Sequence, residues 1–126
     1  MSDRKVQILI VDDEEIVGKR LKTALEKSGY EVEIFQDSRE AVARIADKAF
    51  DIVVTDIRME EIDGMEVLER VLEKSDQTKV IIITGYATLE VAREALTRGA
   101  FDFIAKPFKP NDLREIVVRA VRTLGL

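Results

Sequence analysis

Four short apolar stretches recur along the chain, and they differ in how polar residues are placed within them. VQILIV (residues 6–11), DIVVTD (51–56) and KVIIITG (79–85) contain runs of branched apolar residues without polar alternation. Such runs are typical of parallel strands that are covered on both faces of a sheet. In YEVEIF (30–35) polar and apolar residues alternate, which predicts an edge strand.

Between these stretches, apolar residues recur with the spacing of helices that bury one face. Gly29 and Gly99 are placed as helix stops, and Pro110 lies near the start of the last segment. Asp37 and Glu40 have the spacing of a capping box at a helix start. The buried faces of the predicted helices carry Val17, Leu21, Ala24 and Leu25; Ala41, Val42, Ile45 and Ala46; Leu68, Val71 and Leu72; Val91, Ala92, Ala95 and Leu96; and Leu113, Ile116, Val117, Ala120, Val121 and Leu124.

Strand and helix alternate five times, with a fifth strand expected near FDFIA (101–105), and no linker or repeat interrupts this order. The order predicts an α/β fold with an open, doubly wound parallel sheet and right-handed crossovers. A chain of 126 residues fits one domain, which we place at residues 1–126.

Composition excludes several kinds of chemistry. The chain has no Cys and no His, so a disulfide framework, a thiolate or imidazole metal site and a His-based catalytic triad are impossible. No apolar run has the roughly 20 residues of a membrane span, and Met1–Lys5 is too polar for a signal peptide. We therefore expect a cytoplasmic protein without a membrane partner.

The net charge of −5 argues against direct nucleic-acid binding, but the charge is unevenly spread. Residues 1–85 contain 20 acidic and 13 basic side chains, whereas residues 86–126 contain 5 acidic and 7 basic ones. The mildly basic last third is either an ordinary solvated surface or a face that meets a partner. Its basic residues include Arg93, Arg98, Lys109, Arg114, Arg119 and Arg122.

Polar residues gather where the predicted strands end. Asp12 and Asp13 follow the first strand, and Asp56 follows the third at Thr55. Thr84 ends the fourth strand and is followed by Gly85, while the fifth leads to Lys106 and Pro107. In open α/β sheets ligands bind beyond the carboxyl ends of the strands, so these side chains are expected at one edge. Taken singly, each has a simpler role as a helix cap, a turn, a strand end or a surface lysine.

A binding site is favoured because five polar side chains coincide at strand ends: Asp12, Asp13, Asp56, Thr84 and Lys106. Adjacent carboxylates repel one another unless a cation meets them, and Lys106 neutralises only one charge. Oxygen ligands alone suit Mg²⁺, Mn²⁺ or Ca²⁺, and an open mouth with few carboxylates favours Mg²⁺. A divalent metal, a lysine and a hydroxyl around one carboxylate also fit phosphoryl transfer to an aspartate.

The pattern resembles the receiver domains of two-component response regulators, over essentially the whole chain. The matching segments are ILIVDDE, DIVVTDIRM, DGMEVL, IIITGYA and GAFDFIAKPF. The resemblance implies a flavodoxin-like three-layer sandwich with strand order 2-1-3-4-5, an order for which the receiver fold is itself a standard example. It also implies a module that is not an enzyme beyond catalysing its own phosphorylation and dephosphorylation.

Carried over residue by residue, the resemblance makes Asp56 the phosphoacceptor. Asp13 and Asp56 would bind Mg²⁺ directly, Asp12 would do so through water, and the backbone carbonyl of Arg58 would add a ligand. Mn²⁺ is an alternative metal. The remaining roles are phosphoryl binding by Lys106 and Thr84, room for the phosphodonor at Gly85, and a cis peptide between Lys106 and Pro107.

The resemblance also implies a switch in which Thr84 moves toward the phosphoryl group and an aromatic on the fifth strand turns inward. That aromatic is Phe103, where many relatives have Tyr, so the switch would depend on packing without a hydroxyl. A second departure is Glu60, where Pro is usual. The expected output face comprises the helices at 89–98 and 112–124 and the strand between them.

The expected partners are a sensor histidine kinase or a phosphotransfer protein upstream, and an output domain or protein downstream. Phosphorylation-dependent homodimerisation is a further expectation, but Asn111 and Val118 stand where one common dimer pattern has arginines. Two alternatives stay open. One is a receiver-like binding module that is never phosphorylated, and the other is an aspartate-nucleophile phosphohydrolase, which would need an Asp where this chain has Arg58.

Overall fold

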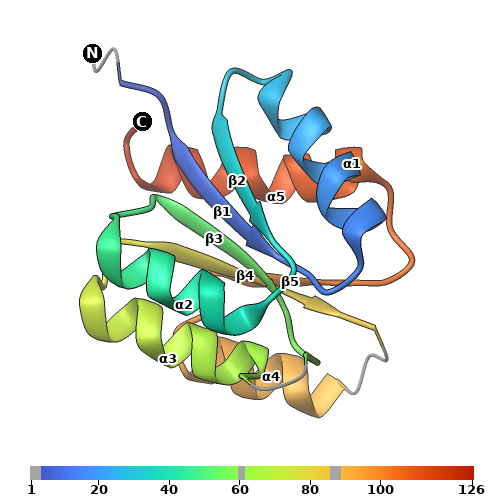
Figure 1. The fold of residues 1–126 in the computed structure, drawn as a ribbon, viewed down its shortest axis with the longest axis vertical. Helices are drawn as coiled ribbons and strands as arrows, with labels where there is room; N and C mark the ends of the chain where they lie inside the picture. The colour runs from blue at the N-terminus through green and yellow to red at the C-terminus, as the bar shows by residue number, and fades with distance from the viewer. Residues whose placement is uncertain (1–3, 60–61, 86–88) are drawn as a thin grey trace.

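A computed structural model of the chain describes residues 4–59, 62–85 and 89–126, and it has the predicted α/β architecture (Figure 1). Strand and helix alternate along the described chain as the hydrophobic pattern predicts. The elements are β1 (Gln7–Val11), α1 (Glu15–Glu26), β2 (Glu31–Phe35), α2 (Ser38–Asp47), β3 (Ile52–Asp56), α3 (Gly64–Lys74), β4 (Lys79–Thr84), α4 (Leu89–Thr97), β5 (Asp102–Ala105) and α5 (Pro110–Thr123).

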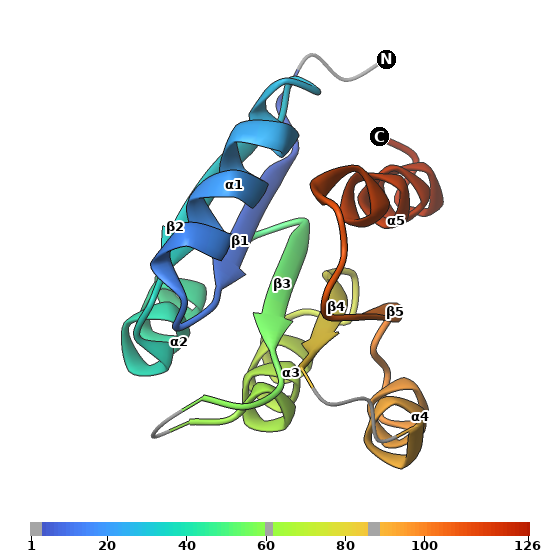
Figure 2. The same ribbon diagram turned by 90° about the vertical axis from the view of Figure 1, so that its right-hand side faces the viewer.

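The sheet has five parallel strands in the order β2-β1-β3-β4-β5, which confirms the expected order. β2, the strand with the alternating pattern, lies at one edge, and β5 lies at the other. β1, β3 and β4 are central and carry the continuous apolar runs. Because all strands run in one direction, their carboxyl ends meet at the same edge of the sheet (Figure 2).

Each face of the sheet is covered by its own set of helices. Helices α1 and α5 lie on one face, while α2, α3 and α4 lie on the other (Figures 1 and 2). Successive strand residues point to opposite faces, so Ile8 and Ile10 belong to the first core and Leu9 and Val11 to the second. Full burial of each such side chain contributes about 1.5–3 kcal/mol, so the central strands form a firm base for their carboxyl ends.

Helix ends follow the sequence signals closely, with small shifts. Asp37 caps α2 by accepting hydrogen bonds from the backbone nitrogens of Arg39 and Glu40. Gly29 and Gly99 adopt positive φ angles of 89° and 112° after α1 and α4, a backbone region that favours glycine. Helix α5 begins at Pro110 and not at Asp112, because proline is favoured in a first turn.

In the described part of the chain, no helix combines the length and the apolar character that crossing a membrane requires.

Candidate functional site

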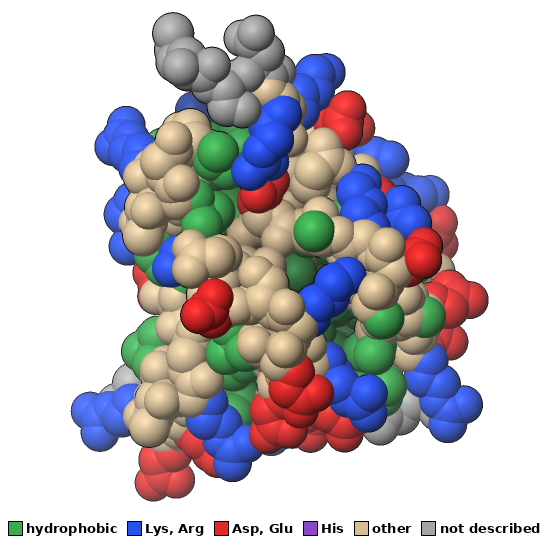
Figure 3. All heavy atoms as spheres, turned by 90° about the vertical axis from the view of Figure 1, so that its left-hand side faces the viewer, with side chains coloured by type: hydrophobic (Ala, Val, Ile, Leu, Met, Phe, Trp, Pro, Cys, Tyr) green, Lys and Arg blue, Asp and Glu red, His purple; other side chains and the backbone are tan. Residues whose placement is uncertain are grey.

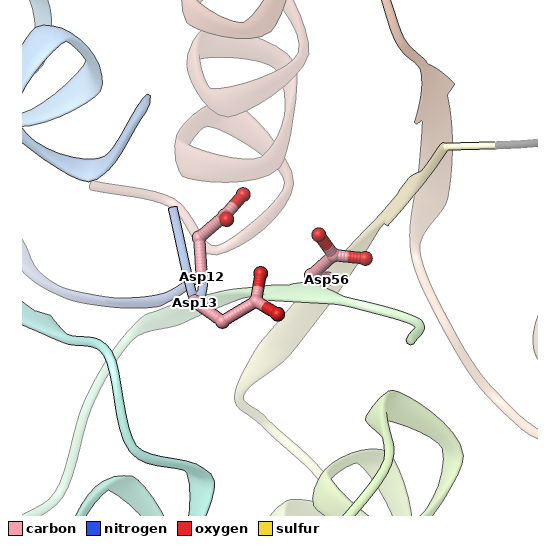
Figure 4. Close-up of side chains that lie close together, drawn as sticks. All are labelled: Asp12, Asp13 and Asp56. Carbon is pink, nitrogen blue, oxygen red and sulfur yellow. The ribbon is translucent and has the colours of Figure 1, made fainter. Parts of the chain in front are cut away.

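Three carboxylates converge at the carboxyl edge of the sheet (Figure 4). Asp12 and Asp13 follow β1, and Asp56 is the last residue of the neighbouring strand β3. One oxygen from each of the three lies within 4.8 Å of the others. Asp12 and Asp56 are buried, with 1% and 5% of their surface exposed, whereas Asp13 is exposed. The topology therefore unites acidic residues that stand more than forty positions apart in the sequence.

Asp12 is held by strand β2 and by the turn that leads into α1, and it does not cap that helix. Its backbone nitrogen donates to the carbonyl oxygen of Phe35 at 3.0 Å, and its Oδ1 accepts from the backbone nitrogen of Glu14 at 2.8 Å. The N-cap of α1 is Glu14, which makes no side-chain capping bond. The simpler interpretation of Asp12 and Asp13 as helix caps is therefore wrong.

Lys106 reaches into the acidic cluster from the end of β5. Its Nζ lies 3.0 Å from Asp56 Oδ2, 3.0 Å from Glu14 Oε2 and 3.3 Å from Asp12 Oδ2. The contact with Asp12 lacks hydrogen-bond geometry, since Asp12 Oδ2 has no hydrogen-bond partner among the described residues. The Lys106 backbone nitrogen donates to the Thr84 carbonyl oxygen at 2.8 Å, and the Lys106–Pro107 peptide is cis.

Burial and neighbouring charges set the protonation of this cluster. Burial raises the pKa of the Asp12 carboxyl above its usual range, against the opposing effects of the Glu14 backbone nitrogen and Lys106. Burial disfavours the charge on Lys106, but hydrogen bonds to Asp56 and Glu14 outweigh it and raise the pKa of the ammonium. Lys106 is therefore a permanent cation, and its single charge does not compensate the carboxylates around it.

The backbone that carries Asp56 is fixed on two sides. Arg58 donates its backbone N–H to Asp56 Oδ1 at 3.1 Å. Next to Asp56, the Ile57 nitrogen donates to the Ile83 carbonyl at 2.8 Å, and the Ile57 carbonyl accepts from the Gly64 nitrogen at 2.9 Å. A Cβ on Gly64 would overlap the Asp56 carbonyl oxygen and lie 2.7 Å from the Ile57 Cα. Only glycine allows α3 to begin this close to the strand end.

Thr84 and Phe103 lie on the same face of the sheet as α3 and α4. Thr84 is buried, and its Oγ1 has no hydrogen-bond partner among the described residues. Its strand neighbour Ile82 belongs to the core that Phe103 packs against, and Ile82 is directly paired with Phe103 across β4 and β5. Gly85 is exposed, and an added Cβ there would meet no atom within 4 Å.

The donor set suits a hard divalent cation. Three carboxylate oxygens from two strands share a small volume with an uncompensated negative charge, as oxygen-liganded Mg²⁺ and Mn²⁺ sites require. Asp12 Oδ2 and Thr84 Oγ1 are buried without a hydrogen-bond partner in residues 4–59, 62–85 and 89–126, which fits a site completed by a polar group from outside the chain. Glu60, the departure noted in the loop after Asp56, lies outside the described residues.

Two residues at the site were missed by sequence reasoning. Glu14 is the third carboxylate on Lys106, yet nothing in the sequence separates it from its acidic neighbours. Gly64 was noted only within the segment DGMEVL, and its close approach to Asp56 depends on how α3 packs. A glycine directly after the α3 cap residue Asp63 was the one signal available for it.

The chain is similar to response regulators in sequence and structure. The family model "Response regulator receiver domain" matches residues 8–118. The regulatory protein AtoC of Escherichia coli is 43% identical over 116 residues, which cover 92% of this chain and 25% of AtoC. The C4-dicarboxylate transport transcriptional regulatory protein DctD of Pseudomonas aeruginosa is 35% identical over 98% of this chain and 27% of its own length.

Solved structures give the same result. A CheY-like receiver domain protein from Methanospirillum hungatei superposes with a TM-score of 0.91 at 35% identity, over 97% of this chain and 98% of its own. NtrX from Brucella abortus superposes with a TM-score of 0.89 at 33% identity, over 97% of this chain and 28% of its own. The chain spans about a quarter of the length of its curated relatives AtoC and DctD. It belongs to the response regulator receiver domain family of two-component signalling.

Proposed function

We propose that this receiver domain accepts a phosphoryl group on Asp56 from a histidine kinase or a phosphotransfer protein, in a reaction that depends on Mg²⁺. Mn²⁺ would serve as an alternative metal. The observation that carries the proposal is the contact of Asp56 Oδ2 with Lys106 Nζ at 3.0 Å, beside two further aspartates whose oxygens lie within 4.8 Å. Of the two buried carboxylates at this edge, Asp56 lies closer to Lys106, at 3.0 Å against 3.3 Å for Asp12.

In the proposed transfer, an Asp56 oxygen attacks the phosphorus while the bond from phosphorus to the donor's imidazole nitrogen breaks. A bound Mg²⁺ would balance the charge that builds on the phosphoryl oxygens. Asp13, Asp56 and the Arg58 carbonyl would hold the metal directly, and Asp12 would hold it through water. Lys106 would pair with one phosphoryl oxygen, and the Thr84 hydroxyl, which has no hydrogen-bond partner among the described residues, would donate to another. Gly85 would leave room for the donor.

We further propose that phosphorylation is read on the face formed by α4, β5 and α5. Thr84 ends β4, and Phe103 lies on the adjacent strand over the same core, so movement of the hydroxyl would change the packing around Phe103. Phe103 lacks a hydroxyl, which limits the coupling to packing. An output domain, a separate protein or a second copy would read this face. Amide exchange should then change more over residues 89–108 than over β2 and α2.

The test is labelling with radioactive acetyl phosphate in the presence and absence of Mg²⁺, for the wild type and two matched variants. Asp56→Asn removes the acceptor while keeping the shape of the side chain. Asp76→Asn makes the same change at an exposed aspartate whose described contact is with Gln77. We expect Mg²⁺-dependent labelling of the wild type and Asp76→Asn, and none of Asp56→Asn.

Labelling of Asp56→Asn at the wild-type rate would overturn the assignment of Asp56. Absence of labelling in all three proteins would favour the remaining alternative, a receiver-like module that acts without phosphorylation. Family membership already favours a signalling module over an aspartate-nucleophile phosphohydrolase.

A further inference from the structure

Glu14 occupies an unusual position beside the proposed acceptor. It is the N-cap residue of α1, its side chain is 60% exposed, and its Oε2 lies 3.0 Å from Lys106 Nζ. Its neighbour Asp13 belongs to the acidic cluster. Glu14 also lines a cavity of about 260 Å³ between α1 and the loop that follows Lys106, together with Arg20 and Phe108. It therefore stands at the mouth of the site and is bonded to the site's cation.

The Lys106 ammonium is already engaged in this arrangement. Two of its hydrogen bonds go to Asp56 and Glu14, and Asp12 adds an ion pair. A phosphoryl group on Asp56 would need Lys106 for its own oxygens, so Glu14 and the phosphoryl group would compete for one cation. The negative charge of Glu14 would also remain close to the incoming anion.

Resting on the function proposed above, we propose that Glu14 is a positioning residue that selects among phosphoryl donors. It occupies one hydrogen bond of the Lys106 ammonium while Asp56 occupies another, and thereby disfavours small anionic donors such as acyl phosphates. A donor protein that places a Lys or Arg next to the exposed Glu14 carboxylate neutralises this charge and releases Lys106 toward the phosphoryl group. Charges at the rim of an interface change the rate of association, and the size of this effect depends on the salt concentration.

The chain offers a closely matched control. Glu15 is the next residue, is also exposed, and pairs with Lys19 at 2.7 Å instead of Lys106. Glu15→Gln therefore removes the same charge from the same turn without touching Lys106. Glu14→Asp keeps the charge on a shorter side chain and tests whether the contact with Lys106 is needed.

The experiment measures three quantities for the wild type, Glu14→Gln, Glu14→Asp and Glu15→Gln. The first is the affinity for Mg²⁺ alone, by calorimetry. The second is the affinity for beryllofluoride, an anionic phosphoryl mimic, by fluorine NMR at saturating Mg²⁺. The third is the labelling rate with acetyl phosphate at low and high salt.

For Glu14→Gln we expect the affinity for Mg²⁺ and the affinity for beryllofluoride to change in opposite directions. Beryllofluoride binding and labelling should strengthen by about two- to fivefold, the range of an exposed ion pair, while Mg²⁺ binding weakens by up to about twofold. Both changes should shrink at ~0.5 M salt. Glu15→Gln should stay within about 1.5-fold of the wild type, and Glu14→Asp should lie between the wild type and Glu14→Gln.

The proposal is overturned if Glu14→Gln leaves beryllofluoride binding unchanged or weakens it, or if Glu15→Gln has an equal effect. Either outcome, with the wild type still labelled, leaves Asp56 as the acceptor and removes only the role of Glu14. Failure of every protein to label and to bind beryllofluoride would instead overturn the proposed function, and the donor selection with it.

Discussion

The two ends of strand β3 carry aspartates with opposite surroundings. Asp51 directly precedes the strand. On the face of the molecule in Figure 3, acidic and basic side chains are interspersed. Asp51 accepts hydrogen bonds from Arg4 at 2.8 and 2.9 Å and from the Gln7 backbone nitrogen at 2.8 Å. Partial burial opposes its charge, but these bonds outweigh burial and hold the pKa of Asp51 below its usual value.

At the other end, Asp56 shares Lys106 with two more carboxylates, and burial raises the pKa of the nearby Asp12. Both ends belong to the same rigid sheet, so the difference does not come from the backbone. At the amino end the Asp51 carboxylate is paired with Arg4 and hydrogen-bonded to the backbone. At the carboxyl end, Asp12 Oδ2 and the buried Thr84 hydroxyl have no hydrogen-bond partner in the described part of the chain, as expected where stability is given up for binding.

The largest effect is expected from a methyl group at Gly64. Gly64→Ala would force α3 away from the Asp56 carbonyl, and we expect it to lower the free energy of unfolding by about 2–3 kcal/mol, as overpacking does. Labelling of Asp56 should fall with it. Gly85→Ala is the matched control, because its Cβ meets nothing, and it should change stability by less than about 0.5 kcal/mol. Urea denaturation measures both; equal losses would show that the close approach is unimportant.

Isosteric changes at the amino and carboxyl edges of the sheet should move the free energy of unfolding in opposite directions. Asp51→Asn loses its charged partner Arg4 and should destabilise the metal-free protein by about 1 kcal/mol without changing the labelling rate. Asp13→Asn relieves repulsion in the acidic cluster and should stabilise the same state by up to about 1 kcal/mol while slowing labelling. A loss of stability in both variants would contradict the distinction between the two ends.

Metal binding should offset part of the charge repulsion that distinguishes the carboxyl edge of the sheet from the amino edge. Mg²⁺ at about ten times its dissociation constant adds ~1.4 kcal/mol by mass action, which raises the melting temperature. The rise should persist in Asp51→Asn and shrink strongly in Asp13→Asn. A melting temperature that stays constant across a Mg²⁺ titration of the wild type would argue against a metal at this edge.

The smallest effect concerns Glu33 on β2, a carboxylate whose charge is paired with two basic side chains. Arg44 and Lys48 hold it at 2.8 Å each, and hydrogen bonding to Arg44 is the main cause that lowers the pKa of Glu33 to about 2. Because its folded pKa is depressed, its stabilising effect is present above about pH 4.5 and is lost as the pH falls toward 2. Since the group is partly exposed, we expect ~1 kcal/mol or less at neutral pH. Glu33→Gln should therefore be less stable than the wild type at pH 7 and equal to it near pH 2.

Hydrophobic periodicity was enough to predict most of the fold. The alternation in residues 30–35 correctly placed β2 at an edge, and the continuous runs correctly marked the central strands. The sequence also predicted that Asp12, Asp56 and Lys106 would meet, because parallel strands end at one edge.

What the sequence could not reveal depends on packing between distant segments. The Glu14 contact with Lys106 joins residues 92 positions apart, and either side chain alone is an ordinary surface residue. The close approach of Gly64 depends on where α3 begins relative to β3. The start of α5 was misplaced because Pro110 is read equally well as a loop residue before the helix or as its first turn.

The most direct measurement is the position of the phosphoryl group in the chain. After incubation with acetyl phosphate and Mg²⁺, borohydride reduces an aspartyl phosphate to homoserine, which peptide mass spectrometry locates. The account predicts homoserine at position 56 alone, only when Mg²⁺ is present, and never at position 51. Homoserine at another aspartate, or at position 56 with the same yield without a divalent metal, would contradict it.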